Sequence, residues 1–232
     1  MKDLTREHPR HTLWRFLLPM LASVMFQQFY SVADSSIAGR FAGEDALAAV
    51  GASLSDYSDI YGLCVGSNLG ASVVVSRLFG AGDLKRMKSA VSTAFIACGV
   101  LSAVLTLFGW FFCSWMMELV HTPENIFSEG ELYLKIYVYG LTFLFLYNVC
   151  TGIFTALGDS RTPLYFLIGS SLGNIFLDFW FVAGLGLGVA GVAWATFIAQ
   201  GISAVLALVT LRFRLTKISC EGRPRLFDWV LL

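Results

Sequence analysis

Three long stretches of this chain carry almost no charge. Residues 89–117 and 136–158 contain no Asp, Glu, Lys or Arg, and residues 162–211 contain only Asp178. A helix needs roughly 20 apolar residues to cross a bilayer. Charged residues make up 14% of the 232 residues, whereas a soluble domain carries about 25%. The sequence therefore predicts an all-α membrane protein, and the alternating pattern of a membrane β-barrel is missing.

Six membrane-spanning helices account for the apolar stretches. Glycine, aspartate and proline at 79–83 and 157–163 predict turns between spans, as does the glycine-rich segment 184–191. We interpret residues 1–232 as a single six-helix unit. The predicted spans are about 13–39, 51–78, 89–117, 132–157, 162–184 and 189–211.

The basic residues orient this bundle. With six spans, 14 of the 16 Lys and Arg residues fall on one side, and only Arg40 and Lys135 fall on the other. The positive-inside rule then places both termini in the cytoplasm. Loops 40–50, 118–131 and 185–188 would face outward. We expect a multi-pass protein of the plasma membrane.

Two aspartates interrupt otherwise apolar spans. Asp34 follows 18 uncharged residues, and Asp178 is the only charge in a stretch of 50. Asp at the centre of a membrane helix costs about 3 kcal/mol on insertion scales, so such acids are functional by default. One interpretation of Asp34 is a proton or sodium site. The other is a hydrated carboxylate near the outer interface, or one paired with Arg40.

Each acid has a hydrogen-bonding neighbour one helical turn away. Tyr30 precedes Asp34 by four residues, and Asn174 precedes Asp178 by four. Residues four apart lie on one face of a helix. We therefore expect two polar helix faces, each built around one acid.

The predicted depths bring several polar residues into one layer. Asp34, Asp178 and Thr196 lie five to seven residues from the outer ends of their spans, which is roughly 8–11 Å below the outer surface. Asn148 lies 16 residues into its span and joins them only if that helix starts later or protrudes. A hydroxyl bonding its own helix backbone is the alternative for Thr196.

The second predicted span carries further polar and small residues. Asp56 and Asp59 lie near its outer end, either as hydrated entrance residues or as part of an outward cavity, and Asn68 lies deeper. Glycines at 62, 66 and 70 predict close helix packing. In the first span, Pro19 removes a backbone hydrogen bond and predicts a kink.

Several motifs together resemble the multidrug and toxic compound extrusion (MATE) family. They are Y-S-V-A-D-x-x-x-A-G-R-F-x-G-x-x-A-L-A-A-V-G at 30–51, S-R-L-F-G-A-G-D at 76–83, N-x-x-L-D at 174–178 and G-L-G-L-G-V-A-G-V-A-W-A-T at 184–196. The resemblance implies a fold of two six-helix bundles related by pseudo-symmetry. It also implies export of organic cations and other amphipathic compounds in exchange for H⁺ or Na⁺.

The resemblance also implies a cation site in the N-terminal lobe. Pro19 matches a first-helix proline associated with bending in some members. H⁺ or Na⁺ would act as the coupling ion, and no other cofactor is expected. The positions that match the family's cation site are Asp34, Asn174, Asp178 and Thr196, with Tyr30 and Asn148 in the same network.

The chain departs from the family in one large respect, since six helices replace about twelve. The resemblance implies the N-terminal half of a cation-coupled antiporter whose second lobe is absent. A lipid-linked oligosaccharide flippase of the same superfamily and a truncated half-transporter without activity of its own are the alternatives. Expected partners are amphipathic or cationic small molecules, the bilayer, and the missing lobe or a second copy, but no nucleic acid. Enzyme motifs such as a nucleophile elbow, a P-loop or HExxH are missing.

Overall fold

The chain folds into long helices. The computed structural model describes residues 9–119, 121–218 and 225–228, without the side chains at 9–12, 15–16, 42, 44–46, 49–50 and 52–61. Within these residues it contains no β-strand. The helices are α1 (Pro9–Ile37), the π-helix η1 (Ala38–Ala42), α2 (Glu44–Gly80), α3 (Leu84–Leu119), α4 (Glu124–Ala156), α5 (Arg161–Asp178), the π-helix η2 (Phe179–Gly184) and α6 (Gly188–Thr216).

Within the described residues, five segments are long and apolar enough to cross a membrane. They are Gly62–Gly80, Leu84–Leu119, Glu124–Ala156, Arg161–Gly184 and Gly188–Thr216. Large apolar side chains such as Phe29, Phe111 and Phe176 lie mostly exposed around the bundle, as expected of surfaces that face lipid. An all-α protein with apolar helices is thus confirmed. The count of six crossings and the side of each loop stay predictions.

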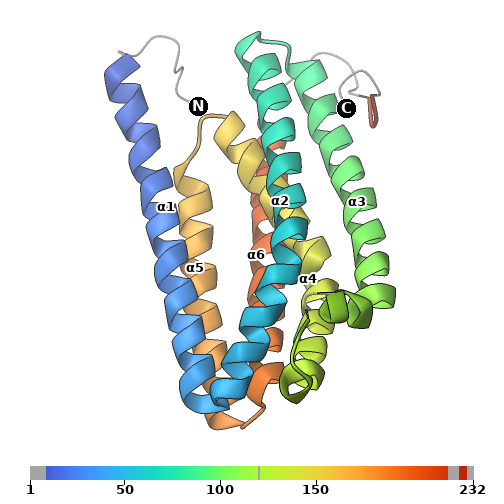
Figure 1. The fold of residues 1–232 in the computed structure, drawn as a ribbon. Coiled ribbons are helices and arrows are strands. Elements are labelled where there is room, and N and C mark those ends of the chain that lie inside the picture. Colours follow the sequence, from blue (N-terminus) through green and yellow to red (C-terminus); the bar gives the residue numbers. More distant parts are fainter. Residues whose placement is uncertain (1–8, 120, 219–224, 229–232) are drawn as a thin grey trace.

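Successive helices run alternately up and down (Figure 1). The α1–α2 and α5–α6 connections lie at one end, and the α2–α3 and α4–α5 connections lie at the other. This grouping agrees with the predicted separation of the basic loops from the remaining ones. It follows from the short turns, because a short connection between long helices forces them to be antiparallel neighbours.

Helix α4 is the centre of the bundle. It packs against α2, α3 and α6, and its side chains Leu141, Phe145 and Phe154 are almost fully buried. Helix α1 instead lies at the periphery, where it packs mainly along α5 (Figure 1). None of the described side chains of α1 is fully buried. The helix that carries Asp34 is therefore the one with the least tertiary packing.

The helices continue beyond the predicted spans into two of the predicted outer loops. Residues 40–50 belong mostly to η1 and α2, and residues 118–131 belong mostly to α3 and α4. These segments contain good helix formers such as Glu, Ala and Leu. Hydropathy marks the part of a helix suited to lipid, and the helix continues beyond it. The turns predicted at 79–83, 157–163 and 184–191 are present.

Close helix packing occurs at glycines other than those predicted. A Cβ at 62, 66 or 70 would meet no atom of the described residues within 4 Å, so the predicted close packing does not occur within this part of the chain. At Gly109 of α3 a Cβ would lie 2.8 Å from a methyl of Val138 in α4. At Gly152 of α4 it would overlap the side chain of Asn68 in α2. Small residues therefore let α2 and α3 approach α4.

Two turns at the same end of the bundle are built alike. Gly82 and Gly158 adopt positive φ angles of 75° and 84°, which suits glycine at a helix C-terminus. The aspartate after each glycine caps the next helix. Asp83 Oδ1 accepts from the Arg86 amide at 3.0 Å, and Asp159 Oδ1 accepts from the Thr162 amide at 3.1 Å.

Asp159 differs from Asp83 because it also contacts a second helix of the bundle, α6. Its carboxylate accepts hydrogen bonds from the Thr162 hydroxyl and from Arg214 of α6. Burial alone would raise the pKa of Asp159, but the bonds from Thr162 and Arg214 outweigh it and lower that pKa below its usual value. The α4–α5 turn is thereby tied to the end of α6.

We expect Asp159→Asn to destabilise the protein at neutral pH by about 1 kcal/mol, the scale of one partly exposed charged contact. A lowered folded-state pKa stabilises above the unfolded value and is lost as pH falls through the folded value. The difference in free energy of unfolding between the parent and Asp159→Asn should therefore be largest at pH 7. It should shrink below about pH 4, the usual pKa of Asp. Thermal unfolding in detergent at several pH values measures it.

Asp83→Asn is the matched control, because Asn caps helices about as well as Asp and Asp83 makes no ion pair among the described residues. It should change stability by a few tenths of a kcal/mol at most. Equal losses in the two variants at pH 7 would contradict a role for the Asp159–Arg214 ion pair.

Candidate functional site

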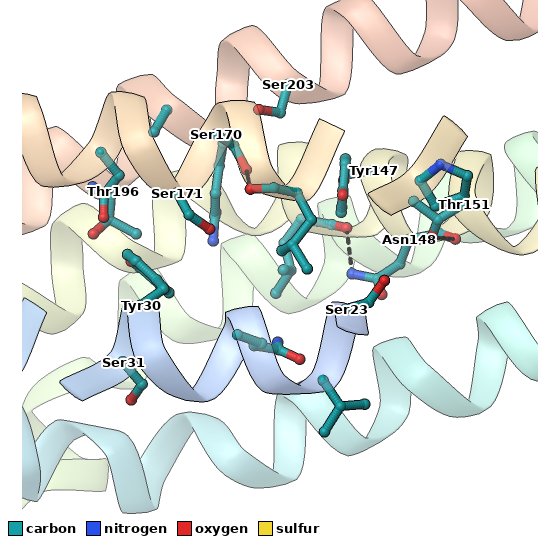
Figure 2. A pocket seen from close by; sticks show the side chains of 18 of the residues that line it. Ser23, Tyr30, Ser31, Tyr147, Asn148, Thr151, Ser170, Ser171, Thr196 and Ser203 are labelled. Carbon is teal, nitrogen blue, oxygen red and sulfur yellow. Dashed lines mark hydrogen bonds between the residues drawn. The ribbon is translucent and has the colours of Figure 1, made fainter. Parts of the chain in front are cut away.

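A cavity of about 580 Å³ lies inside the bundle, between α1, α4, α5 and α6, with Asn68 of α2 on its wall. Its polar lining consists mainly of Ser, Thr and Tyr hydroxyls (Figure 2). Among the described residues that line it, Asp34 is the one charged side chain, and Lys, Arg and His do not occur. A cationic or neutral guest fits this lining better than an anion.

The two predicted aspartates meet at this site. Asp34 lies on α1 and Asp178 is the last residue of α5, and their carboxyl groups are neighbours. Asp178 is completely buried. When both groups are ionised, neither can donate to the other, and no other donor reaches Asp34 Oδ1 or either Asp178 oxygen in the described structure. The alternative pairing of Asp34 with Arg40 does not occur among the described residues.

Two π-helical turns bring the acids together. η2 begins directly after Asp178, and η1 begins four residues after Asp34. The turns contact one another, and the rings of Phe41 and Phe179 pack edge to face with centroids 5.6 Å apart. A π-turn inserts an extra residue into a helix and is frequent at functional sites. Here the paired turns join the ends of α1 and α5 next to the acids.

Asn174 and Thr196 surround the acid pair with further unpaired groups. Asn174 is 2% exposed, and neither its Nδ2 nor its Oδ1 has a hydrogen-bond partner in the described structure. Thr196 Oγ1 also lacks a partner there, so the alternative that it bonds its own helix backbone is wrong. Tyr30 points from α1 toward Thr196 of α6 (Figure 2) and lies near both acids.

The unpaired buried atoms concentrate at this place. Buried polar atoms usually have partners, so each exception needs an explanation. Among the described residues, side-chain atoms of this kind occur in Asn68 and Thr122 and in the four residues predicted for the cation site, Asp34, Asn174, Asp178 and Thr196. The arrangement supplies carboxylate, amide and hydroxyl oxygens from α1, α5 and α6 that are free to hold a small cation.

The chemistry of these donors suits a monovalent cation. The described residues contain no group of three or more His, Cys, Asp or Glu side chains that could hold a metal ion. Divalent cations such as Ca²⁺ take six to eight oxygen ligands, usually with several carboxylates. Two carboxyls with neutral oxygens can instead bind H⁺ directly or surround Na⁺. Asp34, Asn174, Asp178 and Thr196 are the residues that would hold it.

Asn148 lines the same cavity but lies away from the acid pair. Its Nδ2 donates to Leu144 O of its own helix at 2.9 Å, and Figure 2 places it at the opposite end from Thr196. Tyr137, which lies near Tyr30, precedes Asn148 by 11 residues, or about 16 Å along α4. A role for Asn148 in cation coupling therefore stays a prediction, and no direct contact between Asn148 and the acid pair supports it among the described residues.

The remaining predicted residues have mixed outcomes. Asn68 lies on the cavity wall. Pro19 lies within α1, where its carbonyl accepts from Ser23 Oγ at 2.8 Å, and the predicted kink stays a prediction. The backbone of α2 passes through Asp56 and Asp59, but their side chains lie outside the described residues.

The sequence interpretation missed most of the polar wall. On α1, the cavity-lining residues Ser23, Gln27, Tyr30, Ser31 and Asp34 follow helical spacing. On α5, Ser170, Ser171 and Asn174 do so too. This periodicity forms a polar stripe on each of the two helices, and of its members Tyr30, Asp34 and Asn174 were among the predicted site residues.

Known proteins resemble this chain in sequence and in fold. The family model MatE matches residues 19–180. The chain belongs to the MatE family. It is 31% identical over 219 residues to "Probable multidrug resistance protein YoeA" of Bacillus subtilis (strain 168), covering 91% of this chain and 47% of that protein. "Probable multidrug resistance protein YpnP" of the same organism is 29% identical, with 96% and 50% covered. This MatE chain thus spans about half the length of the curated relatives it matches.

Solved structures share the fold. "Crystal structure of MATE in the straight conformation" matches with a TM-score of 0.86 and 25% identity, covering 97% of this chain and 50% of that one. "Outward-facing conformation of a multidrug resistance MATE family transporter of the MOP superfamily" matches with a TM-score of 0.89 and 22% identity, covering 98% and 51%. The helices of this MatE chain therefore superpose on half of each transporter.

We expect Asn174→Leu to stabilise the purified MatE chain in sodium-free buffer. Replacing an unpaired buried amide with an apolar group of similar size removes its desolvation cost, which is about 1–3 kcal/mol. The same change should abolish any stabilisation by added NaCl over choline chloride. Thermal unfolding in detergent provides both readouts.

Asn148→Leu is the matched control, because the Asn148 amide already donates to Leu144 O. Its loss should cost about 1 kcal/mol and leave any sodium response intact. A larger loss of stability in Asn174→Leu than in Asn148→Leu would contradict the view that Asn174 is unpaired.

Proposed function

We propose that this chain is the N-terminal lobe of a cation-coupled exporter of drugs and toxic organic compounds, with H⁺ or Na⁺ as the coupling ion. The observation that carries the proposal is the contact between Asp34 and Asp178 inside the bundle, among unpaired polar groups. Two ionised carboxylates in contact repel each other, and a cation bound between them removes that repulsion. The names of the relatives, probable multidrug resistance proteins, supply the exported substrate class.

Coupling would work through the position of α1. A monovalent cation between the acids lowers the charge of the pair from −2 to −1, offsets their repulsion and favours the arrangement in which α1 packs along α5. Loss of the cation leaves two like charges in contact and favours separation of these helices. Because α1 has little other packing, it is the element that moves most easily. Different cation affinity of the two arrangements is sufficient for coupling.

The topology proposed is six membrane spans with both ends in the cytoplasm, as the basic loops favour. The acid pair then lies in the outer half of the membrane and receives its cation from outside the plasma membrane. The bundle would work together with a second six-helix unit, either a further lobe or a second copy. The alternative is a half-transporter without activity of its own. Crosslinking in membranes tests whether two copies associate, and a transport assay with the isolated chain tests whether it is active.

A lipid-linked oligosaccharide flippase is less well supported. Such a substrate carries an anionic headgroup, and the described cavity lining contains no Lys, Arg or His to neutralise it.

Asp34→Asn and Asp178→Asn should each abolish drug efflux while leaving membrane abundance unchanged. Asn keeps the size of the side chain but cannot take up a proton or supply a charge to Na⁺. Dye efflux from cells that express the protein in its complete transporter measures this, with and without sodium and with a protonophore. Resistance should fall to that of cells without the transporter.

Glu124→Gln provides the control, since Glu124 is an exposed acid at the start of α4, away from the cavity. Efflux by this variant should match the parent. Unchanged efflux in Asp34→Asn or Asp178→Asn would remove the coupling proposal, whatever the control does.

A further inference from the structure

One end of the bundle carries positive charge that the protein does not balance. It is the end with the α2–α3 and α4–α5 connections, where α6 also terminates (Figure 1). Several Lys and Arg side chains there are exposed and make no ion pair among the described residues. They are Arg77, Lys85, Arg86, Arg161, Arg212 and Lys217.

The described acids at this end leave that charge uncompensated. Asp159 is already bound to Arg214, and Asp228 Oδ2 lies 4.0 Å from Arg225 Nη1. Asp83 is the one acid at this end, among the described residues, that is outside an ion pair. Because the formal net charge of the whole chain is zero, attraction for anions is a property of this end and not of the molecule.

The opposite end of the bundle has the opposite sign. Glu118, Glu124 and Glu129 are exposed there and make no ion pair among the described residues. Lys135 at that end is compensated, because its Nζ lies 2.9 Å from Glu131 Oε1. An anionic group in the membrane surface is therefore attracted by the basic end and repelled by the other one.

Two of the unpaired cations stand at the end of an apolar helix face. Tyr165 follows Arg161 by four residues on α5 and is 66% exposed, and Val209 precedes Arg212 by three residues on α6 and is 46% exposed. Residues three or four apart share one face of a helix. Both faces continue along the bundle as exposed apolar side chains, which are Leu172 and Phe176 on α5 and Leu206 and Ile202 on α6.

The ion pair between Asp159 and Arg214 brings these two cations to adjoining helix ends. It ties the start of α5 to the end of α6, and α5 and α6 also pack against each other. Arg161 follows Asp159 by two residues, and Arg212 precedes Arg214 by two. The charge of Arg214 is used by Asp159, whereas the charges of Arg161 and Arg212 stay available to a ligand.

We infer that this end of the bundle binds the headgroup of an anionic phospholipid, with Arg161 and Arg212 as the main contacts. The phosphate would accept charge-assisted hydrogen bonds from the guanidinium groups, and the acyl chains would lie along the exposed faces of α5 and α6. Basic residues at one end of a multi-pass protein also orient it in the membrane, which requires no particular lipid beside them. Unpaired cations at the ends of lipid-facing apolar stripes match both parts of a phospholipid.

This inference is independent of the proposed transport and of the side of the membrane that the basic end faces. The test is native mass spectrometry of the purified protein in detergent, at about 0.1 M ionic strength, where charges interact over about 10 Å. The probes are phosphatidylglycerol and phosphatidylcholine with identical acyl chains. A Lys or Arg near an anionic lipid surface contributes about fivefold to binding, so phosphatidylglycerol should bind about tenfold tighter or more.

Arg161→Gln and Arg212→Gln should each weaken phosphatidylglycerol binding about fivefold and leave phosphatidylcholine binding unchanged. Both side chains are exposed and outside ion pairs in the described structure, so the thermal unfolding temperature should stay that of the parent. Lys135→Gln is the matched control, because Glu131 already compensates the charge of Lys135 at the other end. It should leave the affinity for both lipids unchanged.

Equal affinities for the two lipids would overturn the inference. A phosphatidylglycerol preference that survives in the Arg161→Gln/Arg212→Gln double variant, or an equal loss in Lys135→Gln, would do so too. Glycerol phosphate at the same concentration as phosphatidylglycerol should not displace the lipid, and displacement would show a site for free phosphate instead. None of these results alters the efflux expected of Asp34→Asn, which tests the coupling separately.

Discussion

The contact between Asp34 and Asp178 is the constraint on which the rest of the site depends. A carboxylate inside a membrane bundle is costly, and two in contact are costlier still, because the low dielectric strengthens their repulsion. Packing alone does not explain such an arrangement, since apolar side chains in the same places would stabilise the bundle. Reversible binding of a small cation would account for the presence of both acids at this place. The unpaired Asn174 and Thr196 beside it have the same explanation.

The fold places one member of this pair, Asp34, on the helix with the least tertiary packing, α1. Helix α4 is surrounded by α2, α3 and α6 and forms the rigid part of the bundle. Helix α1 lies outside it and packs mainly on α5, and their π-turns meet through Phe41 and Phe179. Charge at the acid pair therefore acts on the helix with the fewest other restraints. At the opposite end, the Asp159–Arg214 ion pair ties the α4–α5 turn to α6, so the two ends of α5 are held by different interactions.

Much of this was predictable from the residues. The uncharged stretches predict the helices, and the Gly-Asp pairs at 82–83 and 158–159 predict two of the turns. Asp34 and Asp178 were predictable because charge is rare in apolar spans. Thr196 was predictable because its expected depth in the membrane is similar to theirs. Helix ends were less predictable, since a helix continues past the apolar stretch wherever its residues favour helix. The close contacts at Gly109 and Gly152 depend on which helix faces overlap, which one-dimensional spacing does not specify.

The most direct test of the central claim is infrared difference spectroscopy of the purified protein across a pH titration, in sodium-free buffer and with added NaCl. The parent should show a protonated-carboxyl band that disappears at high pH or on sodium binding, and that is missing from the Asp34→Asn/Asp178→Asn double variant. Identical carboxyl bands in the parent and the double variant under every condition would contradict cation binding by this pair.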